Sequence, residues 1–251
     1  MHLYAIGDIH GHLKLLKGAH ELIADDMARH GSGQVIHVGD LVDRGPDSRG
    51  VIDYLMQGQA RGQDWVVLKG NHDRMFTRFL KDPGEPEPGL RSEYSWLHPR
   101  LGGATTLGSY GVGKAADRPI PKVHAEAVEA VPQTHRDYLA QLPIMHIAGD
   151  CVFVHAGLRP GVPLDQQTET DLLWIRDSFL IEVESFGPLV VHGHTAIKEA
   201  THYGNRINLD SSAAYGGPLS AVVIEGREAA LLTPKGRKKL AEPPPLLFRE
   251  E

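Results

Sequence analysis

Cysteine is almost absent from this 251-residue chain, whose single cysteine, Cys151, lies in the apolar run 151–154. One cysteine excludes an intramolecular disulfide, a Cys-rich zinc site and an iron–sulfur cluster. Its apolar neighbours predict a buried side chain. The chain also lacks any stretch near the roughly 18 consecutive apolar residues of a membrane span, and no signal-peptide pattern precedes its first strand-like segment. We therefore expect a cytoplasmic protein with no membrane partner.

An excess of positive charge is lacking as well, because 26 Lys and Arg stand against 32 Asp and Glu, a formal net charge of −6. Binding to nucleic acid without sequence preference normally requires an excess of basic residues, so we expect no nucleic acid partner, and a nuclease is disfavoured. Aromatic residues are few, at 6%, whereas the 15 His outnumber the 6 Phe and 7 Tyr together. The histidines are therefore the first candidates for a functional site.

Short apolar runs alternate with amphipathic segments along the chain, a pattern typical of an α/β protein. In the second half the runs follow one another closely, which predicts a strand-rich and partly antiparallel structure. The pattern leaves open one sandwich of two mixed sheets or an α/β sheet with a separate β unit. Strands are predicted at residues 3–6, 35–38, 65–68, 143–147, 151–154, 189–191, 206–209, 219–224 and 229–232.

We expect one domain over residues 1–240, with an insertion or cap at about 82–133 and a Pro-rich tail at 241–251. The segment 82–133 holds 7 Pro and 7 Gly in 52 residues, a composition that disfavours long regular elements. Helices are still expected at 125–131 and 134–142. We place the insertion near the mouth of the site, where it would influence the choice of substrate.

A glycine-led cluster of polar residues follows each of the first three predicted strands, at residues 7–11, 39–45 and 70–73. Two later strands also end in histidines, His155 after one and the pair His192 and His194 after the other. Because the loops beyond the carboxyl ends of parallel strands meet in one crevice, these clusters should converge.

The residue types in these clusters suit divalent metals. Carboxylate, imidazole and amide oxygen without a thiolate favour ions such as manganese, iron or zinc, and a central carboxylate can bridge two ions that together activate a water. Each cluster also has a structural interpretation, since an Asp after a strand often caps a helix. We interpret His37 as a packed core residue and His12 as a residue at the start of a helix. The spacing of His192 and His194 does not show which of them is a ligand.

Three strings decide the family resemblance: Gly-Asp-Ile-His-Gly at 7–11, Gly-Asp-Leu-Val-Asp-Arg-Gly at 39–45 and Gly-Asn-His-Asp at 70–73. Together they resemble the calcineurin-like metallophosphoesterases, in particular the phosphoprotein phosphatase branch. The resemblance covers about residues 3–224 and is weakest over 82–133. It implies an α/β fold with a central β-sandwich of two mixed sheets flanked by helices. Further matches lie at residues 172–176, 191–195, 207–210 and 214–217.

The resemblance implies two divalent metal ions, most readily manganese, with iron, zinc or nickel as alternatives. Asp40 would bridge both ions, and His194 matches the family ligand better than His192. The six implied metal ligands are Asp8, His10 and Asp40 for one ion, and Asp40, Asn71, His155 and His194 for the other.

The same resemblance implies the catalytic groups. His72 would protonate the leaving alkoxide, with Asp43 accepting its other ring N–H. Arg44 and Arg176 would clamp the phosphate oxygens, a role that suits a planar, permanently charged guanidinium. Tyr215 would border the pocket. The implied reaction is direct in-line attack on phosphorus by a metal-bound hydroxide, and the chain contains no P-loop string that would suggest another phosphate chemistry.

Two substrates remain open. The Asp43-containing string matches serine/threonine protein phosphatases, where that Asp supports the general acid, and we favour a phosphoprotein or small phosphomonoester substrate. Asp73 stands where most eukaryotic protein phosphatases have Glu, and the string 155–157 resembles the symmetrical diadenosine tetraphosphate hydrolases. A nucleotide substrate is therefore the alternative. A metal-binding interaction module without turnover is less favoured, because every expected ligand is present.

Overall fold

The computed structural model describes residues 2–243, and within them the strands form two mixed sheets. The first sheet has the order β11-β10-β9-β1-β2-β3, with β1, β2 and β3 parallel and the others antiparallel. Its strands are β1 (His2–Ile6), β2 (Gly33–His37), β3 (Trp65–Val67), β9 (Ala221–Glu225), β10 (Glu228–Thr233) and β11 (Gly236–Lys239).

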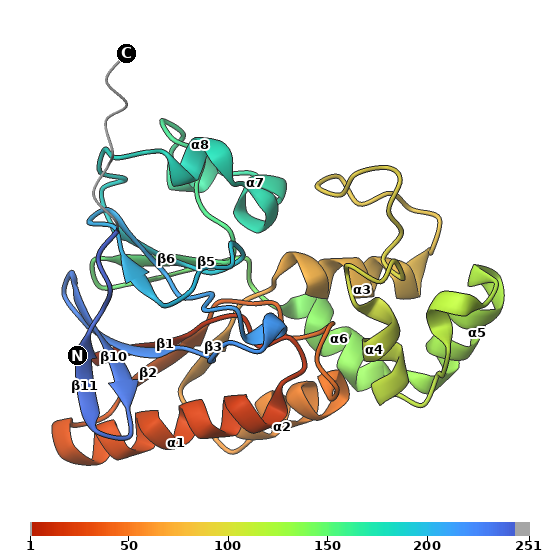
Figure 1. Ribbon diagram of the computed structural model, residues 1–251, viewed down its shortest axis with the longest axis horizontal. Coiled ribbons are helices and arrows are strands. Elements are labelled where there is room, and N and C mark those ends of the chain that lie inside the picture. The colour runs from red at the N-terminus through yellow and green to blue at the C-terminus, as the bar shows by residue number, and fades with distance from the viewer. Residues whose placement is uncertain (1, 244–251) are drawn as a thin grey trace.

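The second sheet has the order β4-β5-β6-β8-β7, in which β5, β6 and β8 are parallel and the two edge strands are antiparallel. Its strands are β4 (Met145–Ala148), β5 (Cys151–Val154), β6 (Leu189–His192), β7 (Thr201–His202) and β8 (Arg206–Asn208). The two sheets pack face to face (Figure 1). The sandwich of two mixed sheets is therefore confirmed, and the alternative of a separate β unit is wrong.

The side chains of β1 alternate between two buried clusters, one between the sheets and one under the helices. Successive side chains of a strand point to opposite faces. Leu3 and Ala5 pack between the sheets against Phe153 and Val191, whereas Tyr4 and Ile6 pack against the helices. These four of the five β1 side chains are buried. The strand is therefore apolar on both faces, as expected of a strand covered on both sides.

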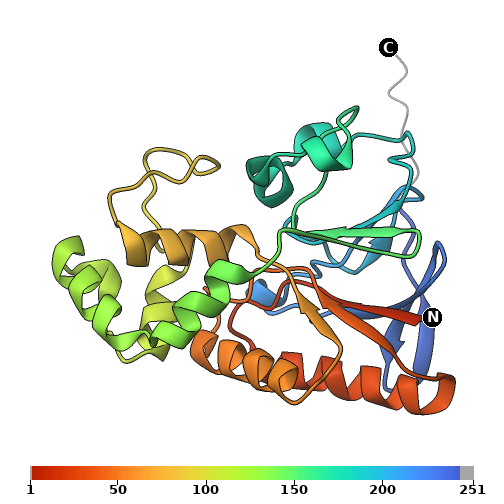
Figure 2. The same cartoon turned by 180° about the vertical axis from the view of Figure 1, so that it is seen from behind.

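Helices cover both outer faces of the sandwich (Figures 1 and 2). The first sheet is covered by α1 (Leu13–His30) and α2 (Ser48–Ala60), and the second by α7 (Glu169–Trp174) and α8 (Asp177–Leu180). The sequence patterns did not predict α7 and α8, because six and four residues are too short to show a helical period. Short 3-10 turns lie at η1 (Ala115–Asp117), η2 (Leu164–Gln166) and η3 (Ala213–Tyr215).

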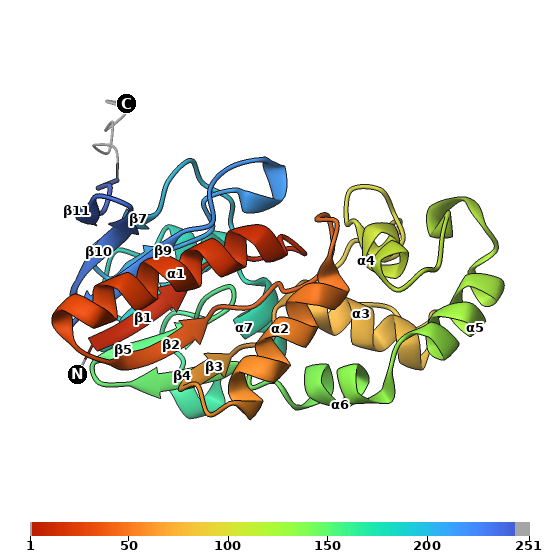
Figure 3. The same ribbon diagram turned by 90° about the horizontal axis from the view of Figure 1, so that it is seen from below.

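A second group of helices lies beside the sandwich (Figure 3): α3 (Asn71–Lys81), α4 (Gly103–Ser109), α5 (Ile120–Ala130) and α6 (Gln133–Gln141). The predicted helix over 125–131 thus begins earlier, at Ile120. Leu107 and Val123 of the 82–133 segment belong to the same buried cluster as Leu16 and Val51 of α1 and α2. Although its composition differs, this segment shares the main core. The boundaries of the domain and of the insertion stay a prediction.

Of the predicted tail, the structure describes residues 241–243, and residues 244–251 lie outside the described part. Leu240, just before the tail, is buried, and the carbonyl of Ala241, its first residue, accepts a hydrogen bond from the His202 amide at 2.9 Å. Cys151 is buried, and burial raises the pKa of its thiol to about 11. Within residues 2–243 no helix is both long enough and apolar enough to cross a membrane.

Candidate active site

The polar clusters of both sheets meet at one edge of the sandwich, beyond the carboxyl ends of β1, β2, β3, β5 and β6. Backbone hydrogen bonds join their loops, since the His10 amide donates to the Asp40 carbonyl at 2.8 Å and the Gly193 amide to the His155 carbonyl at 2.9 Å. A Cβ on Gly45 would lie 2.0 Å from the His10 carbonyl oxygen. Only glycine permits that approach, which explains why the string ends in Gly.

The backbone of the site is unusual. Seven non-glycine residues among those described have positive φ, and five of them are residues that the sequence placed in the site: His10 (44°), Asp40 (50°), Asp43 (73°), Arg44 (66°) and His194 (65°). Such conformations are costly for residues with a Cβ and persist where the surrounding structure holds them. The loops are therefore shaped to aim these side chains, at the expense of local backbone stability.

Asp40 lies between two groups of histidines. One carboxylate oxygen is 3.4 Å from Nε2 of His10 and the other is 3.3 Å from Nε2 of His155. Two buried sets of possible ligands share this carboxylate, one with His10 and His72 and the other with His155 and His194. Its position between the two sets is compatible with a bridging carboxylate.

Asn71 completes the second group. Its Oδ1 lies 2.8 Å from Nε2 of His155 and 3.0 Å from Nδ1 of His194. The opposite nitrogen of His155, Nδ1, donates to the Val38 carbonyl at 2.9 Å, and Nδ1 of His10 donates to the Val42 carbonyl at 2.8 Å. Each of these hydrogen bonds places the proton on Nδ1 and turns the Nε2 lone pair into the site, as second-shell partners do for metal-binding histidines.

The charges of the site suit a cation. Asp8, Asp40 and Asp210 are buried together, and burial, then Asp210 and Asp40, raise the pKa of Asp8 well above its usual value. Burial first, and then Asp40, raises the pKa of Asp210 to about 6. Burial lowers the pKa values of His10, His155 and His194, which favours the neutral imidazole that binds metals. Buried carboxylates beside neutral histidines fit a centre of divalent ions.

Asp8 lies next to these groups but outside both sets. One of its oxygens accepts the His194 amide hydrogen at 3.0 Å, and the other has no hydrogen-bond partner among residues 2–243. An unpaired, buried carboxylate oxygen is unfavourable unless something absent from the chain binds it. This orphan atom is a second sign that the site fits a cation.

His72, a member of the first set of possible ligands, forms a close pair with Asp43: its Nδ1 lies 2.6 Å from Oδ2 of Asp43. The His72 end of the pair is positioned by α3, which begins at Asn71. Asp73 accepts the Gly70 amide at 2.8 Å and the Leu41 amide at 3.0 Å, so it fixes both loops around the pair.

The two arginines approach the site from opposite sheets. The Arg44 guanidinium lies 2.5 Å from Nε2 of His10 and 3.0 Å from Nε2 of His72. Arg176 is exposed and donates to the Thr195 hydroxyl and the His194 carbonyl, both at 3.3 Å. Both guanidinium groups therefore border the cluster of ligands.

The family description "Calcineurin-like phosphoesterase" matches residues 1–223. The chain belongs to the calcineurin-like phosphoesterase family. Members of this family use divalent metals, and the chain is a metal-dependent phosphatase.

The relatives differ in their named substrates. A protein of Anoxybacillus flavithermus named "Bis(5'-nucleosyl)-tetraphosphatase PrpE [asymmetrical]" is 25% identical over 237 residues, covering 86% of this chain and 88% of that protein. Shewanella-like protein phosphatase 2 of Arabidopsis thaliana is 26% identical over 185 residues, covering 62% of this chain and 46% of that protein. A crystal structure provisionally named a diadenosine tetraphosphatase has 25% identity and a TM-score of 0.62, covering 92% of each chain.

Three other histidines of this phosphoesterase lie outside the two sets of possible ligands. His37 is fully buried. Its Nδ1 lies 3.1 Å from the Val66 carbonyl oxygen, and its Nε2 lies 3.0 Å from Nε2 of His20. His192 is also fully buried, packs edge-on against Phe179 and belongs to neither set of possible ligands. Burial lowers the pKa of His192 to about 3. His12 is half-buried at the start of α1.

Sequence reasoning gave no role to several residues near the site. Asp210 lies in the quoted string 207–210 but was assigned nothing, and Trp96 and Thr106 come from the segment with the weakest resemblance. Both contact Asp43, at 2.8 Å and 2.7 Å. Trp174, in a string that was quoted, packs its ring edge-on against His194 with 5.9 Å between centroids. No local pattern marks these contacts, because they join distant parts of the chain.

Proposed function

We propose that this phosphatase hydrolyses phosphomonoesters, most directly phosphoserine and phosphothreonine in proteins. The 2.6 Å pair of His72 and buried Asp43 carries the proposal. A serine or threonine alkoxide is a poor leaving group and needs a proton as the P–O bond breaks. An imidazole oriented by a buried carboxylate is suited to supply that proton.

Two divalent ions, manganese in the first instance, would be held by the six ligands implied by sequence and would supply water activation and charge neutralisation. His10 and His155, fixed by their Nδ1 hydrogen bonds, present lone pairs to the ions. Arg44 and Arg176, which border these groups, would bind phosphate oxygens. His72 gives its Nε2 proton to the leaving oxygen, while Asp43 holds its Nδ1 proton.

A second candidate substrate is a dinucleoside tetraphosphate. The name of the Anoxybacillus relative supports it. The Tyr215 ring is 67% exposed beside Arg44, with 5.3 Å from the Arg44 Cζ to the ring centroid, and could stack on a base. A cavity of about 870 Å³ that Ala213 and Gly216 border also holds Lys14 and Lys17, whose charges suit further phosphates. The sequence alternative was symmetrical cleavage, whereas that relative is named asymmetrical.

Parallel assays decide between these substrates. The manganese-loaded protein would be given a phosphoserine/phosphothreonine peptide and diadenosine tetraphosphate, with His72→Asn as the control. Faster peptide turnover that the control loses supports the proposal. Faster dinucleotide cleavage overturns it, and the products then distinguish two ADP from ATP and AMP. No turnover of either by protein that retains its metals would favour the interaction module. Fractionation of the source cells would test the predicted cytoplasmic location.

A further inference from the structure

The Asp43 carboxylate accepts hydrogen bonds from three separate parts of the chain. Its Oδ2 is 2.6 Å from Nδ1 of His72 and accepts the Trp96 indole N–H at 2.8 Å. Its Oδ1 accepts the Thr106 hydroxyl at 2.7 Å. Asp43 has no exposed surface. Two of these three donors therefore come from the 82–133 segment.

Thr106 also holds the backbone of Asp43. The Asp43 amide donates to the Thr106 hydroxyl oxygen at 2.8 Å, and the Ser48 hydroxyl lies 3.1 Å from the same atom. Asp43 has a φ of 73°, a strained conformation for a residue with a Cβ. One fully buried hydroxyl thus fixes both the carboxylate and the main chain of this residue.

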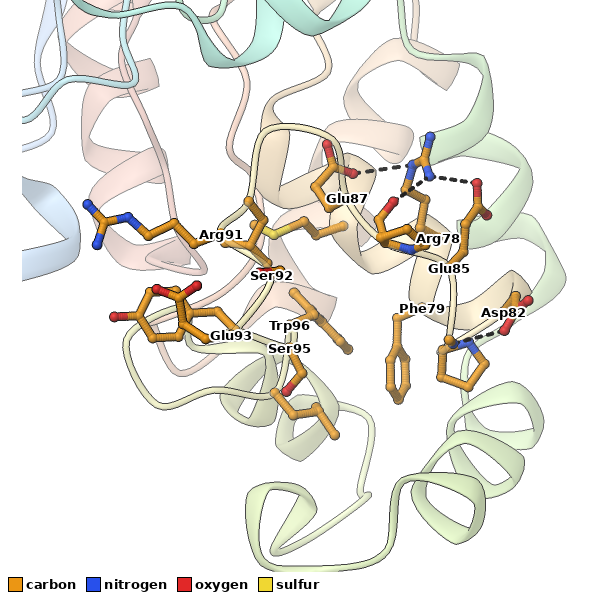
Figure 4. A pocket seen from close by; sticks show the side chains of 17 residues that line it. Arg78, Phe79, Asp82, Glu85, Glu87, Arg91, Ser92, Glu93, Ser95 and Trp96 are labelled. Carbon is orange, nitrogen blue, oxygen red and sulfur yellow. Dashed lines mark hydrogen bonds and ion pairs between the residues drawn. The ribbon is translucent and has the colours of Figure 1, made fainter.

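Trp96 is held firmly where it makes its hydrogen bond. Its indole stacks on Phe76, with 5.2 Å between ring centroids, and packs on Phe79 at 4.8 Å. A Cβ on Gly103 would lie 2.5 Å from the indole, so α4 begins directly against the ring. Figure 4 shows Trp96 and Phe79 in the wall of a cavity of about 400 Å³ beneath the 82–97 loop.

The 82–97 loop that carries Trp96 is itself anchored. Buried Glu87 binds Arg74 and lies 3.2 Å from Nε of Arg78, a contact seen in Figure 4. It also accepts the Trp174 indole N–H at 2.8 Å. The loop therefore spans from α3 to α7, one on each side of the site.

We propose that Trp96 and Thr106 are positioning residues for the general acid, so that the 82–133 segment takes part in catalysis. They hold Asp43 as the acceptor of the His72 Nδ1 proton, which turns Nε2 toward the leaving oxygen. As the P–O bond breaks, the Nε2 proton passes to that oxygen, Nδ1 keeps its proton, and solvent returns a proton to Nε2. The proposal rests on the acid role of His72 given above.

The test compares leaving groups. Trp96→Phe keeps the aromatic packing without the N–H, Thr106→Val keeps the shape without the hydroxyl, and Thr106→Ser restores it. With phenyl phosphate, a poor leaving group, we expect kcat of the first two variants to fall roughly 10–100-fold, as misplaced catalytic groups do. With 2,4-dinitrophenyl phosphate, which needs little protonation, we expect a fall of at most about threefold. KM should stay near that of the wild type, and Thr106→Ser should recover most of kcat.

Matched controls are present in the chain. Trp65→Phe and Thr77→Val remove the same groups away from Asp43, since Trp65 packs on His20 and the Thr77 hydroxyl donates within α3. A readout without turnover is the downfield proton NMR signal of the His72–Asp43 hydrogen bond in metal-free protein. It should shift or vanish in Trp96→Phe and Thr106→Val, vanish in His72→Asn and persist in both controls.

The outcomes separate the two proposals. Equal losses on both substrates in Trp96→Phe and Thr106→Val would mean a structural role alone and would overturn the inference. A leaving-group effect in His72→Asn without one in these variants would overturn the positioning role and leave the proposed function standing. His72→Asn with no leaving-group effect would overturn the acid role itself. If Trp96→Phe does not fold, Thr106→Val and its Ser rescue carry the test.

Discussion

Nε2 of His155 faces Oδ1 of Asn71 at 2.8 Å, although both atoms are hydrogen-bond acceptors. The only N–H of the neutral His155 ring, at Nδ1, donates its hydrogen bond to the Val38 carbonyl. Two lone pairs at this distance repel each other unless a cation lies between them. The contact between His155 and Asn71 is therefore unfavourable by itself and becomes favourable when a metal ion binds both atoms.

Asn71→Ala should therefore remove metal from the second position only. We expect bound manganese, measured by elemental analysis after gel filtration, to fall from about two ions per chain toward one, as a two-metal site predicts. The hydrogen bonds that hold the His10 loop run to the carbonyls of Asp40, Leu41 and Val42, so the first position should remain. Two ions retained in this variant would contradict the assignment of Asn71 as a ligand.

Asp40→Asn should affect both positions. Its two oxygens serve the His10 and His155 groups at 3.4 Å and 3.3 Å, and an amide cannot bridge two cations as a carboxylate does. We expect both ions to be lost and kcat with phenyl phosphate to fall at least about 10³-fold, the scale of losing a main electrostatic element. Near wild-type activity with two bound ions would show that Asp40 is not the bridge.

The buried pair of His20 and His37 predicts acid sensitivity. Burial first, and then His37, lowers the pKa of His20 to about 3, while burial lowers that of His37 to about 4. The unfolded chain therefore binds protons that the folded one does not as pH falls below about 6.5. The stability from these histidines is present above pH 6.5 and decreases from there toward pH 4.

Urea denaturation at pH 7.5 and pH 5 would measure this effect. We expect the wild type to lose about 1–3 kcal/mol of unfolding free energy more than the double variant His20→Leu/His37→Leu over this interval. The difference between the two proteins cancels the other titrating groups. Equal pH dependence in both would show that this pair is not the cause.

Glu87 predicts the largest effect on stability from the loop. Glu87→Gln would remove the closer anionic partner of the buried Arg74 guanidinium, which is 5% exposed, and leave only the Glu169 carboxylate at 3.8 Å. Breaking such a pair costs about 3–5 kcal/mol. The matched control, Glu85→Gln, removes a more exposed partner of Arg78 and should cost less than about 1 kcal/mol. Urea denaturation of both variants checks this, and similar small losses would show that Glu87 does not anchor the loop.

Local sequence patterns were enough to predict the first strands of the fold and the residue clusters of the site. The glycine-led strings at 7–11, 39–45 and 70–73 follow strands whose apolar runs are evident in the sequence, and the parallel sheet rule was enough to predict that they converge. The metal chemistry could be predicted because the ligands belong to short strings with their own residue types. Strand β1 was predictable for the same reason, since each of its buried residues is apolar.

Only the tertiary structure decided how distant parts meet. Whether the second set of strands forms a separate unit or the facing sheet depends on packing between Ala5 and Phe153, which no local pattern encodes. The same holds for Trp96 and Thr106, which lie 53 and 63 residues from Asp43 in the chain and touch its carboxylate. A hydrogen bond depends on direction and distance in space, and a sequence pattern reports only spacing along the chain.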